Sequence, residues 1–426
     1  MTDSTIKAIH ARRVWDSRGR PTVEAEVTLA DGSMGRGIAP AGASRGTREA
    51  IDLRDGGVKL GGLDVQRAVA NVNGEIARAL AGMNAHDQAA LDQRLIELDG
   101  TPDKARLGGN ATIAVSLAVL HSSAASAGQP LWERVSEGGA VTMPLPEIQI
   151  FGGGAHAGRR VDIQDFMVMP LGARSFAEAL EMTAEVYLAA GALMKAAGKL
   201  AGVADEGGWW PLFDANDEAL VMLTRAIEHA GFKHHEMAIS LDIAASEFGA
   251  NGRYTLGLDQ RTLDTAGMID MLGGWLDAYP IVSIEDPLAE DDEAGLIEFT
   301  RRFGTRCQII GDDYLVTSAA RVDHAAKVKA VNSALIKLNQ AGTVTETRAA
   351  LDAAKAHGMS TLVSARSGET EDVSITHLAI GWNAGQLKVG SFARSERMAK
   401  WNEAIRIEEA TRVAFTGMRA LPQRRA

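Results

Sequence analysis

The chain has almost no cysteine, which excludes the classes of protein that depend on several cysteines. Only Cys307 is a cysteine among 426 residues, so the chain can hold neither a disulfide framework nor a zinc site built on several cysteines. Cys307 begins an apolar run, where we expect a buried, unreactive thiol. No apolar stretch is long enough to span a bilayer, and the first residues lack the apolar core of a signal peptide. We therefore expect a cytoplasmic protein with no membrane partner.

Positive charge is also in short supply. The chain has 44 basic and 55 acidic residues, a formal net charge of -11. This balance argues against nucleic acid as a partner, although a local basic pocket can still hold an anion. Hydrophobic residues make up 46% of the chain and charged residues 23%, an ordinary globular composition. The length indicates two domains, or one large barrel with an appendage.

Residues 1–135 and 136–426 show different patterns. The first region opens with three strand-like segments joined by turns, and a hairpin is indicated at Asp31-Gly32. Three helix-like stretches follow, at residues 64–80, 86–98 and 110–127. Strands followed by helices are typical of an α+β domain. We therefore predict an N-terminal α+β capping domain over 1–135, and a second domain beyond a boundary rich in glycine and proline.

Six short apolar runs in the second region each carry a charged side chain at or near their carboxyl end. Helix-length stretches separate the runs, a pattern typical of buried parallel strands in βα units. The charged residues are Asp242, Glu285, Asp312, Lys337, Arg366 and Lys388. Charges at the carboxyl ends of successive strands are typical of an α/β barrel, in which they meet at one mouth. The fold class predicted for residues 136–426 is a TIM-like α/β barrel.

Three of these charged residues are carboxylates, which predicts a metal site. A single acid at a strand end is usually a helix cap or a surface residue. Asp242, Glu285 and Asp312 follow three strands in a row, and like charges brought together repel one another unless a cation lies among them. Carboxylate oxygens suit hard cations such as Mg²⁺. We interpret the three acids as a Mg²⁺ triad.

The two lysines are the second chemical feature of the barrel mouth. Lys337 has apolar neighbours on both sides, and a buried lysine must be paired or functional. The plain alternative is a structural ion pair. The functional interpretation is a general base whose pKa is lowered by burial and a nearby metal ion. Lys388 repeats the pattern in a later strand.

Three further segments are candidates for the same site. Asp205 and Glu206 precede two glycines, which indicates a backbone that bends or approaches another group closely, although adjacent acids are also common on surfaces. His156 lies in a glycine-rich loop that loosely fits a dinucleotide motif, but no βαβ unit surrounds it. The loop at 39–50, which contains Ser44, is either a connector or a mobile lid.

Taken together, these segments resemble the enolase family, the phosphopyruvate hydratases of glycolysis. The resemblance extends from about Ile6 to Glu409. The segments that carry it are WDSRGRPTVEAEV, ELDGTPDKARLGGNA, DEGG, LDIAASEF, YPIVSIEDPLAEDD, GDDYLVT, IKLNQAGTVTET, RSGETED and FARSERMAKWNEAIRIEE. The resemblance implies an N-terminal α+β domain that caps a modified eight-stranded barrel, usually in a homodimer. It also implies the removal of water from 2-phosphoglycerate, a small phosphorylated acid, to give phosphoenolpyruvate with two Mg²⁺.

The resemblance also implies roles for individual residues. Asp242, Glu285 and Asp312 match the ligands of the first Mg²⁺, and Ser44 matches a loop serine that reaches the second. Lys337 matches the base at C2, and Glu206 matches the acid that assists departure of the C3 hydroxyl. The residues that match other substrate contacts are His156, Asp165, Arg366, Ser367 and Lys388.

Several positions depart from the family pattern. Asp165 stands where the family normally has glutamate, and Ala365 where it normally has histidine. Smaller departures are Gly152 for asparagine, Ala41 and Arg45 for serine and threonine, and added aromatic bulk at Trp209 and Trp210. These departures leave three functions open: a working enolase, a relative with an altered second half-reaction such as carboxyphosphonoenolpyruvate synthase, and a catalytically impaired binding protein.

Overall fold

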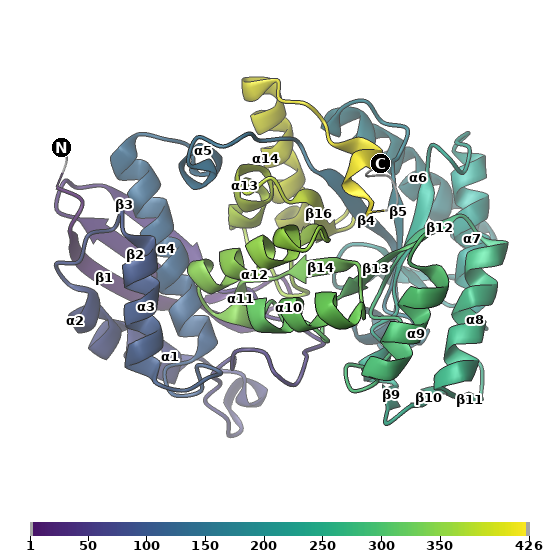
Figure 1. Ribbon diagram of the computed structural model, residues 1–426, viewed down its shortest axis with the longest axis horizontal. Coiled ribbons are helices and arrows are strands. Elements are labelled where there is room, and N and C mark those ends of the chain that lie inside the picture. The colour runs from purple at the N-terminus through teal and green to yellow at the C-terminus, as the bar shows by residue number, and fades with distance from the viewer. Residues whose placement is uncertain (1–2, 423–426) are drawn as a thin grey trace.

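Three antiparallel strands begin the chain, as the sequence predicts. A computed structural model describes residues 3–422. In it β1 (Ile6–Trp15), β2 (Pro21–Leu29) and β3 (Met34–Ile38) form one sheet in that order (Figure 1). The central strand β2 is almost wholly buried, because α4 (Gly109–Ala127) packs across β2 and β3. The meander expected from the sequence is confirmed.

Helices complete this first region. Residues 64–80, expected as one helix, form α1 (Gln66–Asn71), a π-helical turn η2 (Val72–Ile76) and α2 (Ala77–Leu80) in succession. The side chain of Asp87 accepts a hydrogen bond from the N–H of Ala90 and caps the helix α3 (Gln88–Asp99). The remaining helical segments of this region are η1 (Lys59–Gly62) and α5 (Leu131–Ser136).

Eight strands close into a barrel in the second region. They are β4 (Leu145–Gly152), β5 (Asp165–Met169), β8 (Ala238–Asp242), β12 (Ile281–Glu285), β13 (Gln308–Gly311), β14 (Ser333–Ile336), β15 (Ser360–Ser364) and β16 (Gly385–Gly390). Pairing of β16 with β4 closes the ring. β5 runs antiparallel to both of its neighbours, β4 and β8, while the other pairs are parallel. The predicted eight-stranded α/β barrel is therefore confirmed, and the structure adds one reversed strand that the apolar pattern did not predict.

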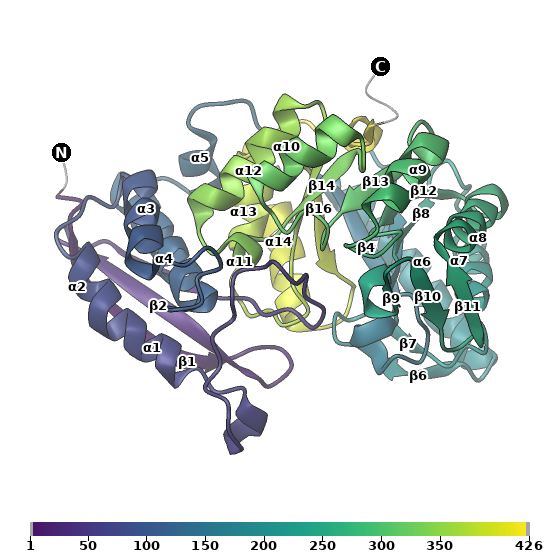
Figure 2. The ribbon, with the colours of Figure 1, turned by 60° about the horizontal axis from the view of Figure 1, so that its bottom comes forward.

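Helices surround the barrel on its outside (Figure 2). The longer ones are α6 (Phe176–Ala196), α7 (Asn216–His229), α8 (Thr265–Ala278), α9 (Glu293–Phe303), α10 (Ala319–Val328), α12 (Val344–Ala356), α13 (Ser374–Gly381) and α14 (Ser395–Thr411). Shorter elements are β6 (Leu200–Val203), β7 (Trp209–Pro211), β9 (Gly249–Ala250), β10 (Arg253–Leu256), β11 (Arg261–Asp264), η3 (Gly154–Ala157), η4 (Ala245–Glu247), α11 (Leu338–Ala341) and η5 (Gly417–Ala420). No helix within residues 3–422 is long and apolar enough to cross a membrane.

The parallel strands bring the predicted charges to one end of the barrel. Asp242 and Glu285 are the last residues of β8 and β12, and Asp312 and Lys337 directly follow β13 and β14. Lys388 instead lies inside β16, two residues before its end. Its side chain therefore starts deeper in the barrel than the sequence pattern suggested. Cys307 is fully buried, so the prediction of a buried cysteine is confirmed, and burial raises the pKa of its thiol, which fits the expected low reactivity.

Buried histidine makes the stability of the fold sensitive to acid. His377 on α13 is 9% exposed, and burial lowers its pKa from 6.5 to about 4. The folded protein therefore holds this imidazole neutral at pH values where the unfolded chain protonates it. We expect the free energy of unfolding to fall by up to about 3 kcal/mol as the pH drops from 6.5 to 4.

Urea unfolding at pH 7 and pH 4.5 measures this effect. His377→Asn removes the titrating group, so its free energy of unfolding should change less between the two pH values. His235→Asn, in an exposed loop, is the matched control and should retain the full pH dependence. Equal pH dependence in His377→Asn and the unmodified protein would refute the assignment.

Candidate active site

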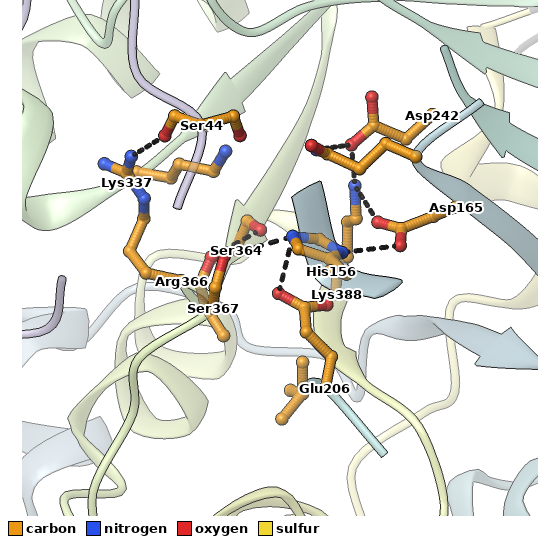
Figure 3. Close-up of a pocket in the computed structure, with 13 residues that line it drawn as sticks. Ser44, His156, Asp165, Glu206, Asp242, Lys337, Ser364, Arg366, Ser367 and Lys388 are labelled. Carbon is orange, nitrogen blue, oxygen red and sulfur yellow. Dashed lines mark hydrogen bonds and ion pairs between the residues drawn. The ribbon is translucent and has the colours of Figure 1, made fainter. Parts of the chain in front are cut away.

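A cavity lies at the carboxyl ends of the barrel strands (Figure 3). Most of the predicted site residues line it: Ser44, His156, Asp165, Glu206, Asp242, Lys337, Arg366, Ser367 and Lys388. Glu285 and Asp312 are not in its wall, but they contact the lysines that are. The structure therefore brings together residues from the N-terminal region, from the β6–β7 hairpin and from all eight barrel strands or the loops that adjoin them.

Lys388 lies among carboxylates at the base of the cavity. Its Nζ donates to Oδ2 of Asp242 at 3.0 Å and to Oε2 of Glu285 at 2.7 Å, and lies 3.7 Å from Oδ2 of Asp165. Burial alone would lower the pKa of Lys388, but Asp242, Glu285 and Asp165 together raise it well above its usual value. Lys388 is therefore a fixed positive charge and is not suited to accept a proton.

The carboxylates around Lys388 have the donor chemistry of a site for a divalent cation. Within residues 3–422, Oε1 of Glu285 is buried without a hydrogen-bond partner. Burial, together with the charge of Asp242, raises the pKa of Glu285 well above its usual value. A hard cation stabilises a carboxylate that is buried beside another carboxylate. The charge and the free oxygen therefore fit Mg²⁺.

The closest groups of possible metal ligands are not the predicted triad itself. Among the described residues, two sets of three have ligand atoms all within 4.8 Å of one another, namely His156–Asp165–Glu206 and Asp286–Asp312–Asp313. Asp312 is drawn toward its own partners, because it accepts hydrogen bonds from Lys337 and, at 2.7 Å, from Gln340. Asp242, Glu285 and Asp312 thus face one region without forming a compact cluster.

Lys337 forms a buried ion pair with Asp312 (8% and 5% exposed). Lys337 is the residue just before the short helix α11, and its side chain reaches the cavity. Burial alone would lower the pKa of Lys337, but the Asp312 carboxylate raises it instead. Among the protein groups the Asp312 carboxylate therefore outweighs burial, whereas the predicted lowering of the Lys337 pKa also depended on a nearby metal ion.

A loop from the N-terminal region covers one side of the cavity. Ala41 exchanges backbone hydrogen bonds with Gly368 at 2.9 and 2.8 Å, which docks the loop against the segment after β15. The guanidinium of Arg366 donates to Glu49 at 2.9 and 3.2 Å and to the carbonyl oxygen of Ser44 at 2.9 Å. Arg366 and Glu49 are both buried. This pair fastens the N-terminal loop to the barrel at the cavity.

His156 connects two sides of the cavity. Its Nδ1 lies 2.9 Å from Oδ1 of Asp165, and its Nε2 lies 3.0 Å from Oγ of Ser367 and 3.7 Å from Oε1 of Glu206. Burial alone would lower the pKa of His156, but Glu206 and Asp165 raise it to about 9. We therefore expect a positively charged imidazole beside Glu206 near neutral pH.

Glu206 lies on the tight turn of the β6–β7 hairpin. The turn is closed by a 2.8 Å hydrogen bond from the N–H of Ala204 to the carbonyl oxygen of Gly208. Trp209, after the turn, stacks on Tyr187 with ring centroids 4.5 Å apart, and Trp210 packs near Gly158. Neither tryptophan lines the cavity. The expected aromatic bulk near the acid therefore supports the hairpin from outside.

Two of the departures from the family pattern, at Ala365 and Gly152, have different surroundings. Ala365 lines the cavity at 7% exposure, so a larger side chain there would enter the space available to a substrate. Gly152 has no such space. A Cβ at that position would lie 2.6 Å from Cβ of Ala204, so the local packing excludes any side chain.

Four polar residues of the site were not predicted from the sequence: Gln149, Gln164, Glu49 and Gln340. Each is buried, and each binds a predicted site residue. Gln149 and Gln164 lie on or beside barrel strands, so a polar residue within an apolar run was an available signal. Glu49 had no comparable signal, because its partner Arg366 is distant in sequence.

An eight-stranded barrel with carboxylates, lysines and an arginine around one mouth defines an enzyme that acts on a small anionic substrate. Comparison with known proteins identifies the family. Residues 6–135 match the model of the enolase N-terminal domain, and residues 140–422 match that of the enolase C-terminal TIM barrel domain. Enolase 1 of Desulfitobacterium hafniense (strain Y51) is 49% identical over 409 residues, covering 95% of this chain and 94% of that protein. The chain belongs to the enolase family and is a lyase of that family.

Proposed function

We propose that this chain is a Mg²⁺-dependent phosphopyruvate hydratase that converts 2-phosphoglycerate into phosphoenolpyruvate. The observation that carries the proposal is one cavity with Lys337 at one margin and Glu206, beside His156, at another (Figure 3). Elimination of water needs a base for the C2 proton and an acid for the departing C3 hydroxyl, at different positions around the substrate.

Each side chain has a proposed role in this reaction. Lys337 accepts the proton from C2, and Glu206 assists departure of the hydroxyl group. Lys388, whose charge is fixed by Asp242 and Glu285, stabilises the negative charge that develops on the substrate carboxylate. The residues proposed to contact the rest of the substrate are His156, Asp165, Arg366 and Ser367.

We assign the metal to the acidic side chains of the barrel mouth. Asp242, Glu285 and Asp312 would hold the first Mg²⁺, and Ser44 would reach the second. The unpaired Oε1 of Glu285, noted above for the described part of the chain, supports this assignment. When bound, Mg²⁺ supplies positive charge that neutralises the substrate carboxylate and makes the C2 proton more acidic. We further propose a homodimer or larger homo-oligomer, as is usual in the family, which sedimentation analysis would test.

The assay of dehydration tests the function directly. With Mg²⁺ and 2-phosphoglycerate, purified protein should generate the ultraviolet absorbance of phosphoenolpyruvate. EDTA should abolish the signal, and added Mg²⁺ should restore it. Proton exchange at C2 in D₂O without any product would instead indicate a relative with an altered second half-reaction, the alternative that Ala365 favours. If neither exchange nor product is detected, both proposed activities, enolase and the diverted relative, are contradicted.

Ala365→His separates the working enolase from the diverted relative. If Glu206, His156 and Lys337 already form a complete site, an added imidazole should change kcat for dehydration by less than about tenfold. A gain of about 100-fold or more would indicate that the native site has moved away from dehydration. Ala326→His, at a partly buried position on α10 that does not line the cavity, controls for the added bulk.

A further inference from the structure

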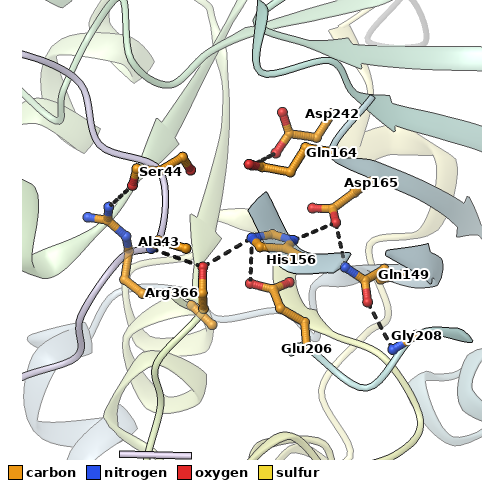
Figure 4. A network of polar contacts seen from close by, with 12 residues as sticks. Ala43, Ser44, Gln149, His156, Gln164, Asp165, Glu206, Gly208, Asp242 and Arg366 are labelled. Carbon is orange, nitrogen blue, oxygen red and sulfur yellow. Dashed lines mark hydrogen bonds and ion pairs between the residues drawn. The ribbon is translucent and has the colours of Figure 1, made fainter. Parts of the chain in front are cut away.

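Gln149 on β4 lies behind the cavity wall and binds two separate parts of the site (Figure 4). Its side chain is buried, with the residue 1% exposed. Its Oε1 accepts a hydrogen bond from the backbone N–H of Gly208 at 2.9 Å, and its Nε2 donates to Oδ1 of Asp165. Both ends of one amide are therefore engaged by groups next to the proposed acid.

The orientation of this amide is determined by its partners. A backbone N–H can only donate, and an ionised carboxylate can only accept. The amide oxygen must therefore face Gly208, and the amide nitrogen must face Asp165. A leucine at position 149 would lose both hydrogen bonds while keeping a similar volume.

The two partners of Gln149 lead to the two groups around the leaving hydroxyl. Asp165 binds Nδ1 of His156 through the same Oδ1 that accepts from Gln149. Gly208 closes the turn that carries Glu206. Gln149 thus spans the distance between the turn of Glu206 and the pair formed by His156 and Asp165.

The glycines around Gln149 leave room for its amide. A Cβ at Gly208 would lie 2.4 Å from Oε1 of Gln149, and one at Gly152 would lie 3.4 Å from the same atom and 2.6 Å from Ala204. A side chain at either position would displace the amide or the turn. The packing therefore reserves this space for the side chain of residue 149.

We propose that Gln149 is a positioning residue for the dehydration step, which sets the separation between Glu206 and the His156–Asp165 pair. This inference rests on the proposed function. It also accounts for the aspartate at 165. Aspartate is one methylene shorter than the glutamate that is usual in the family. Glutamine at 149 is one methylene longer than asparagine, and it spans the distance that the shorter carboxylate leaves open. The combined length of the two side chains, rather than the length of either, is what the site requires.

Gln149→Leu is the first test. Because Lys337 lies at the other margin of the cavity, exchange of the C2 proton should stay within about threefold of the unmodified protein. Dehydration should fall by about 10- to 100-fold, since a displacement of about 1 Å at such a site can cost that much. The ratio of dehydration to exchange should therefore fall at least about tenfold. General destabilisation would lower both rates together.

Gln308→Leu is the matched control. Gln308 is a buried amide at the opposite end of the barrel, where it donates to Ser333 and Ser360 at 2.6 and 3.2 Å. Gln308→Leu should lower the free energy of unfolding about as much as Gln149→Leu does, and it should leave the ratio of dehydration to exchange unchanged. An equal fall of this ratio in both variants, or an unchanged ratio in Gln149→Leu, would overturn the inference.

A length exchange gives a second test that does not depend on the leucine variant folding. Gln149→Asn and Asp165→Glu each change the combined length, so each should lower the dehydration-to-exchange ratio. The double variant restores the combined length and should recover the ratio to within about threefold of the unmodified protein. A double variant no better than the weaker single variant would overturn the inference. Absence of both reactions in the unmodified protein would instead overturn the proposed function.

Discussion

Replacement of Lys337 by methionine is expected to lower exchange of the C2 proton by about 10³-fold or more. Methionine keeps most of the length and packing of the buried side chain but cannot accept a proton. Lys337 is proposed for this role because its position matches the base of the enolase family, whereas Lys388 is surrounded by Asp242, Glu285 and Asp165. Deuterium incorporation into 2-phosphoglycerate, followed by NMR, measures the step without requiring dehydration.

Lys327→Met is the control for Lys337→Met. Lys327 is exposed on α10, so its replacement should leave exchange unchanged. The rise in Tm caused by Mg²⁺ should persist in Lys337→Met, which would separate loss of the base from loss of metal binding. Exchange within tenfold of the unmodified rate would contradict the assignment of Lys337.

Glu285→Gln is expected to lower kcat/KM by at least about 100-fold at a fixed Mg²⁺ concentration, since it would alter a proposed ligand of the metal. Glutamine keeps the shape of the side chain but removes a full negative charge. The side chain of Glu285 is fully buried, and its only side-chain hydrogen bond within residues 3–422 is to Lys388, through one oxygen. Loss of this charge should weaken the site for Mg²⁺ more than it disturbs the fold.

Two titrations with Mg²⁺ check this prediction. Activity should need far more Mg²⁺ in Glu285→Gln, and the Mg²⁺-dependent rise in Tm should shrink or disappear. Glu181→Gln, at an exposed position on α6, should behave like the unmodified protein in both titrations. A Glu285→Gln variant that gains the same Tm at the same Mg²⁺ concentration would exclude Glu285 as a ligand.

The ion pair between Arg366 and Glu49 of the N-terminal loop could not be predicted from the sequence. The sequence pattern predicted that Arg366 lies beyond a barrel strand, and the structure bears this out. It did not predict Glu49 as the partner, which comes from a loop more than 300 positions earlier. Local patterns of apolar and charged residues carry no information about which distant loop docks on a given strand end.

The pKa of Lys337 likewise depends on a contact that the sequence does not reveal. Two buried lysines near three carboxylates were predicted from the strand pattern. The direction of the Lys337 pKa shift was not, because it depends on the contact of its ammonium with Asp312. Burial and an adjacent opposite charge shift a lysine pKa in opposite directions, and only the contact distances decide which effect is larger.

The order of residues alone determined the barrel, the three-stranded meander and the end of the barrel at which the charges gather. These features follow from the periods of apolar residues and from the common direction of parallel strands, which are local properties. Tertiary structure decided which polar groups meet, such as Gln149 with Asp165 and Gly208. Such contacts arise when strand register, turn closure and side-chain length agree across distant segments, and no short stretch of sequence contains all three.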